Sequence, residues 1–322
     1  MITVWVLDSQ YHFKACKANQ QRGQPGLFTF NRATFLTTMK YWLKEKMNLS
    51  VFSDEISPAS TRAIKLAVEW KVSHIEVRSL DNGRFPRVTN NELADFRQRF
   101  TDAGLAVSGV SPGLFKCHVS DSALAKGMTE ILPRACEWAL RFGTNQISIF
   151  GFRRGEEANL PDEIIDRVDQ MCSIASAAGC RLLLENEASC WGSTGRQATE
   201  IIRRIGPDRL QLCWDPANSA RAGSIHPYPD EYEELRDSRN CVIGCIHMKN
   251  YISTMAKWAL LEIGDINWKN HLDAMQQDGF NGFAVVETHT DVPVEGPNLV
   301  NKNLTPLESN TYLNIEFVRK CL

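Results

Sequence analysis

The chain has 322 residues, of which 43% are hydrophobic and 23% charged, and its formal net charge is −2. This composition is typical of a soluble globular protein with one large domain, and the charge gives no reason to expect a nucleic-acid partner. No apolar run approaches the ~20 residues of a membrane-spanning helix. The ten cysteines include no C-x-x-C pair, which favours free thiols in a reducing cytoplasm over a disulfide scaffold or a zinc knuckle.

Residues 1–48 differ from the rest of the chain. They carry seven Lys or Arg against two acids, and a loose Gln/Gly/Pro patch spans residues 20–26. No hydrophobic period runs through them, so we expect either a poorly ordered extension or a start codon upstream of the true one, with Met47 as the real start. We assign no function to this part.

From Leu49 onward, short apolar strands alternate with helices that commonly end at glycine. The expected strands are 49–54, 74–77, 105–110, 146–150, 181–187, 210–215, 242–247 and 283–287. The expected helices are 58–71, 91–103, 123–142 with a kink or break at Pro133, 161–178, 196–205, 228–236, 268–277 and 307–320. The alternation, with no G-x-G-x-x-G after the first strand, predicts an α/β fold that is a single (β/α)8 barrel over 49–322.

Four consecutive strands end on a residue that commonly binds metals: Glu185, Asp215, His247 and Glu287. Taken singly, Asp215 before Pro216 is typical of a helix N-cap, and His247 is typical of a hydrogen-bonded core histidine. Strand ends of a barrel meet at one rim, however, where three carboxylates would repel one another without a cation. The combination therefore predicts one divalent metal, Mn²⁺ in the first place and Mg²⁺, Co²⁺ or Zn²⁺ as alternatives.

An ordered set of motifs places the chain beside a known family. The motifs are Glu185-Asn186, Trp214-Asp215-Pro216, His247-x-Lys249-Asn250, Glu262-Ile-Gly-Asp-Ile-Asn-Trp268 and Gly282-x-x-x-Val286-Glu287. With them, the region from Leu49 to Leu322 resembles the xylose isomerase-like TIM-barrel superfamily, in its sugar phosphate isomerase/epimerase branch. The resemblance implies that the four residues bind one metal, that Glu185 and Glu287 transfer protons, and that the protein is a homodimer or homotetramer.

The chemistry of such a site is consistent with the resemblance. A carboxylate removes a proton from the carbon beside a carbonyl only if the resulting enediolate is stabilised, and a metal that chelates two substrate oxygens does this. Two glutamates on opposite sides of the metal then give isomerisation or epimerisation of a sugar, sugar phosphate or polyol. If a β-hydroxyl leaves instead, the same base gives an inosose-type dehydration.

Further residues are candidates for contacts with the substrate. Glu187 stands where many relatives carry histidine after Glu-Asn, and Asn218 stands where ketose epimerases commonly carry histidine, so both differ from the usual pattern. Arg78, Arg153 and Arg154 are candidates for binding a phosphate or carboxylate. The substrate-facing candidates are Glu187, Asn218, Lys249, Glu76, Arg153, His118 and Trp191. Each has an alternative structural role, as a solvated acid, an ion-pair partner or a core residue, and His289 is a candidate for supporting Glu287.

Two other functions have less support from the sequence. An endonuclease IV-like phosphodiesterase uses the same barrel with three zinc ions, but its site is rich in histidine, and the whole chain here has seven His. A barrel that binds sugars without catalysis usually has an incomplete set of ligands, whereas all four are present here.

Overall fold

The computed structural model describes residues 3–7, 13–17, 47–238, 242–290, 292 and 303–322, and the chain divides into two units, Met1–Glu45 and Lys46–Leu322. In the first unit, β1 (Thr3–Leu7) pairs antiparallel with β2 (Phe13–Lys17). No strand was expected there from the sequence. The other residues of the expected extension, up to residue 46, lie outside the described residues.

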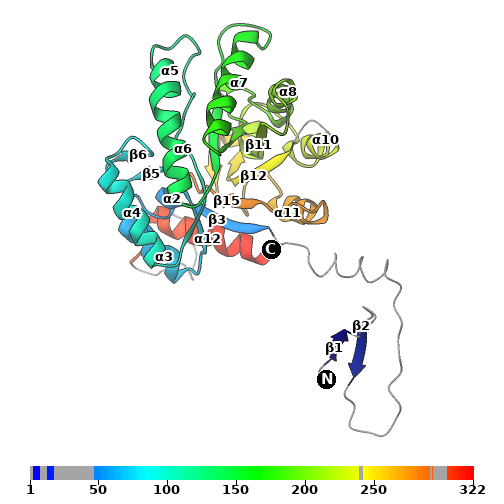
Figure 1. Ribbon diagram of the computed structural model, residues 1–322. Coiled ribbons are helices and arrows are strands. Elements are labelled where there is room, and N and C mark those ends of the chain that lie inside the picture. The colour runs from blue at the N-terminus through cyan, green and yellow to red at the C-terminus, as the bar shows by residue number, and fades with distance from the viewer. Residues whose placement is uncertain (1–2, 8–12, 18–46, 239–241, 291, 293–302) are drawn as a thin grey trace. The chain divides into compact units, whose positions relative to one another are not determined.

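The second unit is a closed barrel of eight parallel strands (Figure 1). The strands are β3 (Asn48–Phe52), β4 (His74–Val77), β7 (Ala106–Val110), β8 (Gln146–Arg153), β9 (Arg181–Glu185), β11 (Leu210–Trp214), β12 (Ile243–Met248) and β15 (Phe283–Val286). Pairing of β15 with β3 and of β8 with β9 closes the ring. The predicted fold is therefore confirmed, with strand ends within a few residues of those expected.

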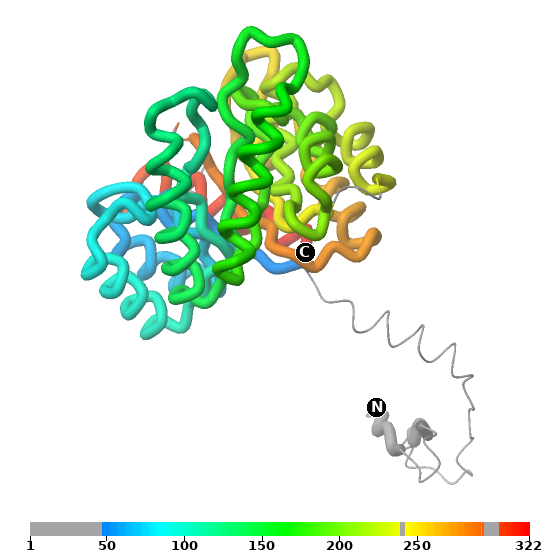
Figure 2. The backbone as a smooth tube through the Cα atoms, turned by 45° about the horizontal axis from the view of Figure 1, so that its top comes forward, coloured from blue at the N-terminus to red at the C-terminus, as the bar shows by residue number. Residues whose placement is uncertain are grey.

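Helices cover the outside of the ring, as Figure 2 shows. They are α2 (Ser53–Ile56), α3 (Ser60–Glu69), α4 (Asn90–Asp102), α5 (Ala123–Lys126), α6 (Leu132–Arg141), α7 (Asp162–Ala177), α8 (Gly195–Ile205), α9 (Pro216–Arg221), α10 (Tyr232–Asp237), α11 (Trp268–Gln277) and α12 (Pro306–Cys321). Three further segments are helical turns: η1 (Gly127–Ile131), η2 (Pro227–Glu231) and η3 (Ser253–Met255). In the described part of the chain, no helix is both long and apolar enough to cross a membrane.

Two local differences from the expected elements have clear causes. The helix expected over 123–142 contains the π-helical turn η1 just before Pro133, because proline has no N–H with which to continue the regular ladder. Strand β8 continues to Arg153 because β10 (Cys190–Trp191) pairs with it antiparallel. A Cβ on Gly151 would lie 2.2 Å from the carbonyl oxygen of Trp191, so this close pairing requires glycine.

Short hairpins extend the ends of two strands and were missed by the sequence analysis. One joins β5 (Ser79–Leu80) to β6 (Gly83–Arg84) after β4, and the other joins β13 (Asn250–Ile252) to β14 (Lys257–Ala259) after β12. Their strands are only two or three residues long, too short for an alternating pattern to identify them.

A neutral histidine packs between α11 and the barrel. His271 is fully buried, stacks on Trp268 and Tyr228, and accepts a hydrogen bond at Nε2 from the Trp214 indole at 3.3 Å. Burial lowers the pKa of His271 to about 3. The core on this side of the barrel therefore depends on an unprotonated imidazole.

This histidine predicts a specific acid sensitivity. The unfolded histidine titrates near 6.5, so the unfolded state binds more protons between pH 6.5 and about 3, and the free energy of unfolding falls as pH drops through that window. The substitution His271→Phe removes this pH-dependent contribution to the free energy of unfolding. In urea titrations, the free energy of unfolding should fall between about pH 7 and about pH 4.5 by roughly 2–3 kcal/mol less in the variant than in the wild type. The exposed His226→Phe is the control, and an equal loss in wild type and His271→Phe would contradict the assignment.

Candidate metal centre

The four predicted ligands come together at the carboxyl ends of four neighbouring strands. Glu185 ends β9, Asp215 follows β11, His247 lies in β12 and Glu287 follows β15, in the sheet order β15-β12-β11-β9. All four side chains are buried, and each offers a ligand atom within 4.8 Å of the others. We call this group the quartet.

His247 has ring nitrogens that are available to a metal once the ring loses its proton. Both ring nitrogens are buried and have no hydrogen-bond partner among the described residues, although oxygens of Glu185 and Glu76 lie 3.4 Å and 3.3 Å from Nδ1 and Nε2. Burial alone would lower the pKa of His247, but the Glu76 and Glu185 carboxylates raise it well above its usual value. The protonated ring supplies positive charge among these carboxylates, and a divalent metal would take over that charge as the ring loses its proton, so the quartet fits a divalent metal.

Asp215 fills both of the roles considered for it. Its Oδ1 caps α9 by accepting a hydrogen bond from the Asn218 backbone at 2.9 Å, while Oδ2 faces the quartet. The side chain of Asn186 accepts from the Asp215 backbone N–H and donates to the Asp215 carbonyl. Asn218 donates to Glu185 Oε1 at 3.3 Å and to the Asn186 carbonyl at 2.9 Å. These amides fix two of the four ligands in place.

Lys249 occupies the centre of the acidic group. Its Nζ lies 2.7 Å from Asp215 Oδ2, 2.8 Å from Glu287 Oε2 and 3.9 Å from Glu185 Oε1, and the residue is only 3% exposed. Burial disfavours the ammonium, but the three carboxylates outweigh burial and raise the pKa of Lys249 well above its usual value. The lysine therefore supplies the positive charge that the carboxylates need.

Glu287 is also held from its other side. Arg78 donates to Glu287 Oε1 at 2.7 Å and also pairs with Asp54 and Glu55 at 2.8 Å and 2.6 Å. His289 Nδ1 lies 3.2 Å from Glu287 Oε1. Burial opposes ionisation of Glu287, yet Lys249, His289 and Arg78 hold its pKa well below the usual range. Each of the three guanidinium nitrogens of Arg78 therefore already donates to a carboxylate of the protein.

The other sequence candidates lie around the mouth of the barrel at different depths. Glu76 accepts a hydrogen bond from Ser111 beside His247. Glu187 is buried and pairs with Lys116 at 2.7 Å and Arg221 at 3.6 Å. His118 and Arg153 are exposed, and Trp191 is buried in β10 with the Arg154 guanidinium over its ring. Within the described residues, these last three form no hydrogen bond or ion pair with the quartet.

Sequence reasoning missed one aromatic residue at the site. Trp258, on β14, lies 5.4 Å from Lys249 Nζ and 5.1 Å from the His289 ring. The hairpin that carries it is anchored by Asn250, which bonds to Leu261 and Ile266, and a Cβ on Gly264 would lie 2.3 Å from the Asn250 side chain. The motif His247-x-Lys249-Asn250 and the glycine of the following motif were the available signal.

Comparisons with known proteins agree with the barrel fold. A family model described as "Xylose isomerase-like TIM barrel" matches residues 64–321. A structure of L-ribulose 3-epimerase is 20% identical with a TM-score of 0.64, and covers 86% of this chain and 94% of its own. The probable 3-DHS dehydratase AsbF of Bacillus anthracis is 17% identical with a TM-score of 0.63, covering 85% and 98%. No curated protein matches the chain in sequence.

A third solved structure was determined with a metal ion. It is a xylose isomerase-like TIM barrel protein from Mycobacterium smegmatis in complex with magnesium, 19% identical with a TM-score of 0.61, covering 86% of this chain and 96% of its own. At these identities the likeness to solved structures shows the fold alone.

The position of Lys249 predicts competition with a metal. A divalent cation and the ammonium require the same oxygens of Asp215 and Glu287, so Lys249→Met should bind Mn²⁺ at least about tenfold more tightly than the wild type. The metal-free variant should unfold at lower temperature, because it leaves buried carboxylates uncompensated. Calorimetric Mn²⁺ titration and thermal unfolding in EDTA measure both effects, with the exposed Lys257→Met as control. Weaker Mn²⁺ binding by Lys249→Met would contradict competition.

Proposed function

The chain belongs to the xylose isomerase-like TIM barrel family, and from this premise we propose that it is a divalent-metal-dependent isomerase or epimerase of a sugar, sugar phosphate or polyol. The observation that carries the proposal is the pair Glu185 and Glu287, two buried carboxylates at the ends of different strands that both offer an oxygen to the quartet and both approach Lys249 Nζ. Proton removal and proton return at a substrate carbon require two such groups.

A metal in the quartet would be held by Glu185, Asp215, His247 and Glu287, and it would act as a Lewis acid toward negative charge on the substrate oxygens. Three carboxylate ligands and one imidazole favour Mn²⁺, with Mg²⁺, Co²⁺ and Zn²⁺ as alternatives. A homo-oligomer stays a prediction from the resemblance, and a cytoplasmic location stays a prediction from the free cysteines.

The surroundings of the two glutamates support different roles. Glu287 has three cationic neighbours, Arg78, Lys249 and His289, whereas Glu185 contacts His247 and lies farther from Lys249, at 3.9 Å. A carboxylate with fewer cationic contacts is the stronger base, so we assign proton removal to Glu185.

Glu287 has a route by which to exchange its proton with solvent. Burial alone would lower the pKa of His289, but Glu287 and Glu55 raise it to about 9, so the ring is protonated at neutral pH. Its Nδ1–H points to Glu287 Oε1 at 3.2 Å, and the side chain is 33% exposed. We assign His289 as the source of the proton that returns to the substrate, with Glu287 staying ionised until negative charge on the substrate draws the proton across.

Dehydration is the second candidate, and Lys249 favours it. Its ammonium carries protons at the centre of the mouth, where a departing hydroxyl of the substrate needs a donor. A phosphodiesterase with several metals is less well supported, because the neighbouring acidic cluster of Glu55, Glu287 and His289 already holds the Arg78 guanidinium.

The test is hydrogen exchange from solvent. Mn²⁺-loaded protein incubated in deuterated water with ketoses, ketose phosphates and keto-inositols should place deuterium on the carbon beside the carbonyl of its substrate. Glu185→Gln and Glu287→Gln should each reduce the rate by about 10²–10⁴, while the buried Glu231→Gln, outside the mouth, should retain it.

Product analysis separates the two chemistries. Epimerisation or isomerisation conserves the mass of the substrate apart from deuterium, whereas dehydration releases one water. Exchange that persists in both Glu185→Gln and Glu287→Gln would refute carboxylate proton transfer at this site.

A further inference from the structure

Arg84 lies at the same mouth and was not among the sequence candidates. It ends the β5–β6 hairpin that follows β4, and its guanidinium rests on Gly113 in the loop after β7. A Cβ on Gly113 would lie 2.4 Å from Arg84 Nε, and Gly113 has a φ of +64°. The space under the guanidinium therefore exists because residue 113 is glycine.

A short chain of contacts connects Arg84 to the quartet. Its Nη2 donates to the Ser111 carbonyl at 3.2 Å, and the Ser111 hydroxyl donates to Glu76. Glu76 Oε1 in turn lies 3.3 Å from His247 Nε2. Arg84 is thus fixed to the same strand ends that carry the proposed chemistry.

Arg84 forms no ion pair with a carboxylate among the described residues, although Asp54 and Glu185 lie near enough to favour its charge. Arg78 pairs with three carboxylates, Lys249 with Asp215 and Glu287, and Lys116 with Glu187. Arg84 makes only its bond to a backbone carbonyl, and its buried Nε has no hydrogen-bond partner in the described part of the chain. Burial, followed by the nearby positive charge of Arg78, lowers the pKa of Arg84.

We propose that Arg84 binds an anionic group of the substrate, a carboxylate or a phosphate, so that the protein acts on an acidic compound rather than on a neutral sugar. A guanidinium forms paired, charge-assisted hydrogen bonds with either group, and Nε remains available for one of them. This inference rests on the proposed function, because the bound anion is a substrate only if the barrel mouth is the active site.

The other arginines considered for this role are placed differently. Arg78 is saturated by Asp54, Glu55 and Glu287. Arg154 lies over the ring of Trp191, and Arg153 is exposed at the end of β8. Arg84 therefore combines an unpaired charge, partial burial and a direct connection to the quartet.

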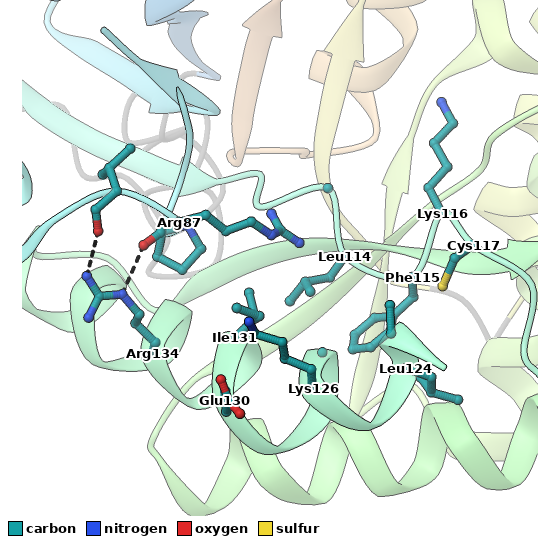
Figure 3. Close-up of a pocket in the computed structure, with 15 residues that line it drawn as sticks. Arg87, Leu114, Phe115, Lys116, Cys117, Leu124, Lys126, Glu130, Ile131 and Arg134 are labelled. Carbon is teal, nitrogen blue, oxygen red and sulfur yellow. Dashed lines mark hydrogen bonds between the residues drawn. The ribbon is translucent and has the colours of Figure 1, made fainter. Parts of the chain in front are cut away.

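Arg87 provides a matched control three residues farther along the chain. It is exposed and donates to the Pro112 carbonyl at 2.7 Å. With Lys126 and Arg134 it lines a cavity of about 550 Å³ that borders Gly113 but is not lined by Arg84 (Figure 3). None of the quartet lines this cavity. Binding that depends on Arg84 but not on Arg87 thus belongs to the barrel mouth.

The experiment measures anion binding to the full chain by calorimetry, with inorganic phosphate and acetate as probes. The protein is dialysed against EDTA, so that neither probe binds through a metal. We expect Arg84→Gln to weaken binding of the preferred probe by about 10–100-fold and Arg84→Lys to weaken it less, while Arg87→Gln stays within about twofold of the wild type. Preference for phosphate indicates a phosphorylated substrate, and preference for acetate indicates a carboxylic acid. Thermal unfolding of each variant checks that it is folded.

The outcomes separate this inference from the proposed function. Three results would overturn the anion site, whatever the exchange assay gives. They are an Arg84→Gln variant that binds the probe as tightly as the wild type, an equal loss of affinity in Arg87→Gln, and a wild type that binds neither probe. Anion binding that depends on Arg84, with no deuterium exchange on any compound, would support the site and count against the isomerase or epimerase reaction. Exchange on a neutral ketose with the same KM in wild type and Arg84→Gln would overturn the acidic substrate alone.

Discussion

The structure depends on how buried negative charge is balanced at one end of the barrel. Glu76, Glu185, Asp215 and Glu287 are all buried there. Each ionised carboxylate taken out of water costs several kcal/mol unless a cation or a set of hydrogen bonds compensates it. His247 and Lys249 lie among these acids, and Arg78 approaches Glu287 from outside. The charges are so close that replacing any one of these residues changes the pKa of the others.

The parallel barrel is what allows this concentration of charge. Alternation along each strand sends Glu185 and Leu183 to one face, and likewise Asp215 with Cys213 and His247 with Cys245. Leu183, Cys213 and Cys245 form a small apolar cluster with Phe283 below the quartet. These residues bring no further charge to the quartet, and their burial strengthens the electrostatic interactions above them. The asparagines at 186 and 218 then orient the ligands without adding charge.

Much of this site follows from the sequence, and the rest has identifiable reasons for being missed. Strand ends that carry Glu185, Asp215, His247 and Glu287 can be predicted, because an acid after an apolar run marks the rim of a parallel sheet. The insertion of Lys249 between Asp215 and Glu287 depends on a side-chain conformation that spacing does not define. Arg84 and Trp258 lie on hairpins too short to show periodicity. The role of Gly113 becomes visible only when the guanidinium of Arg84 is seen resting on it.

The central claim is that the quartet is a metal site and that Lys249 holds the place of the metal in its absence. Anomalous X-ray diffraction from crystals of the Mn²⁺-loaded protein tests this most directly. The account predicts one anomalous peak bounded by Glu185, Asp215, His247 and Glu287, with Lys249 Nζ withdrawn from the 2.7 Å contact to Asp215 that it makes without metal. Crystals at saturating Mn²⁺ with no peak at the quartet and Lys249 still bound to Asp215 would contradict it.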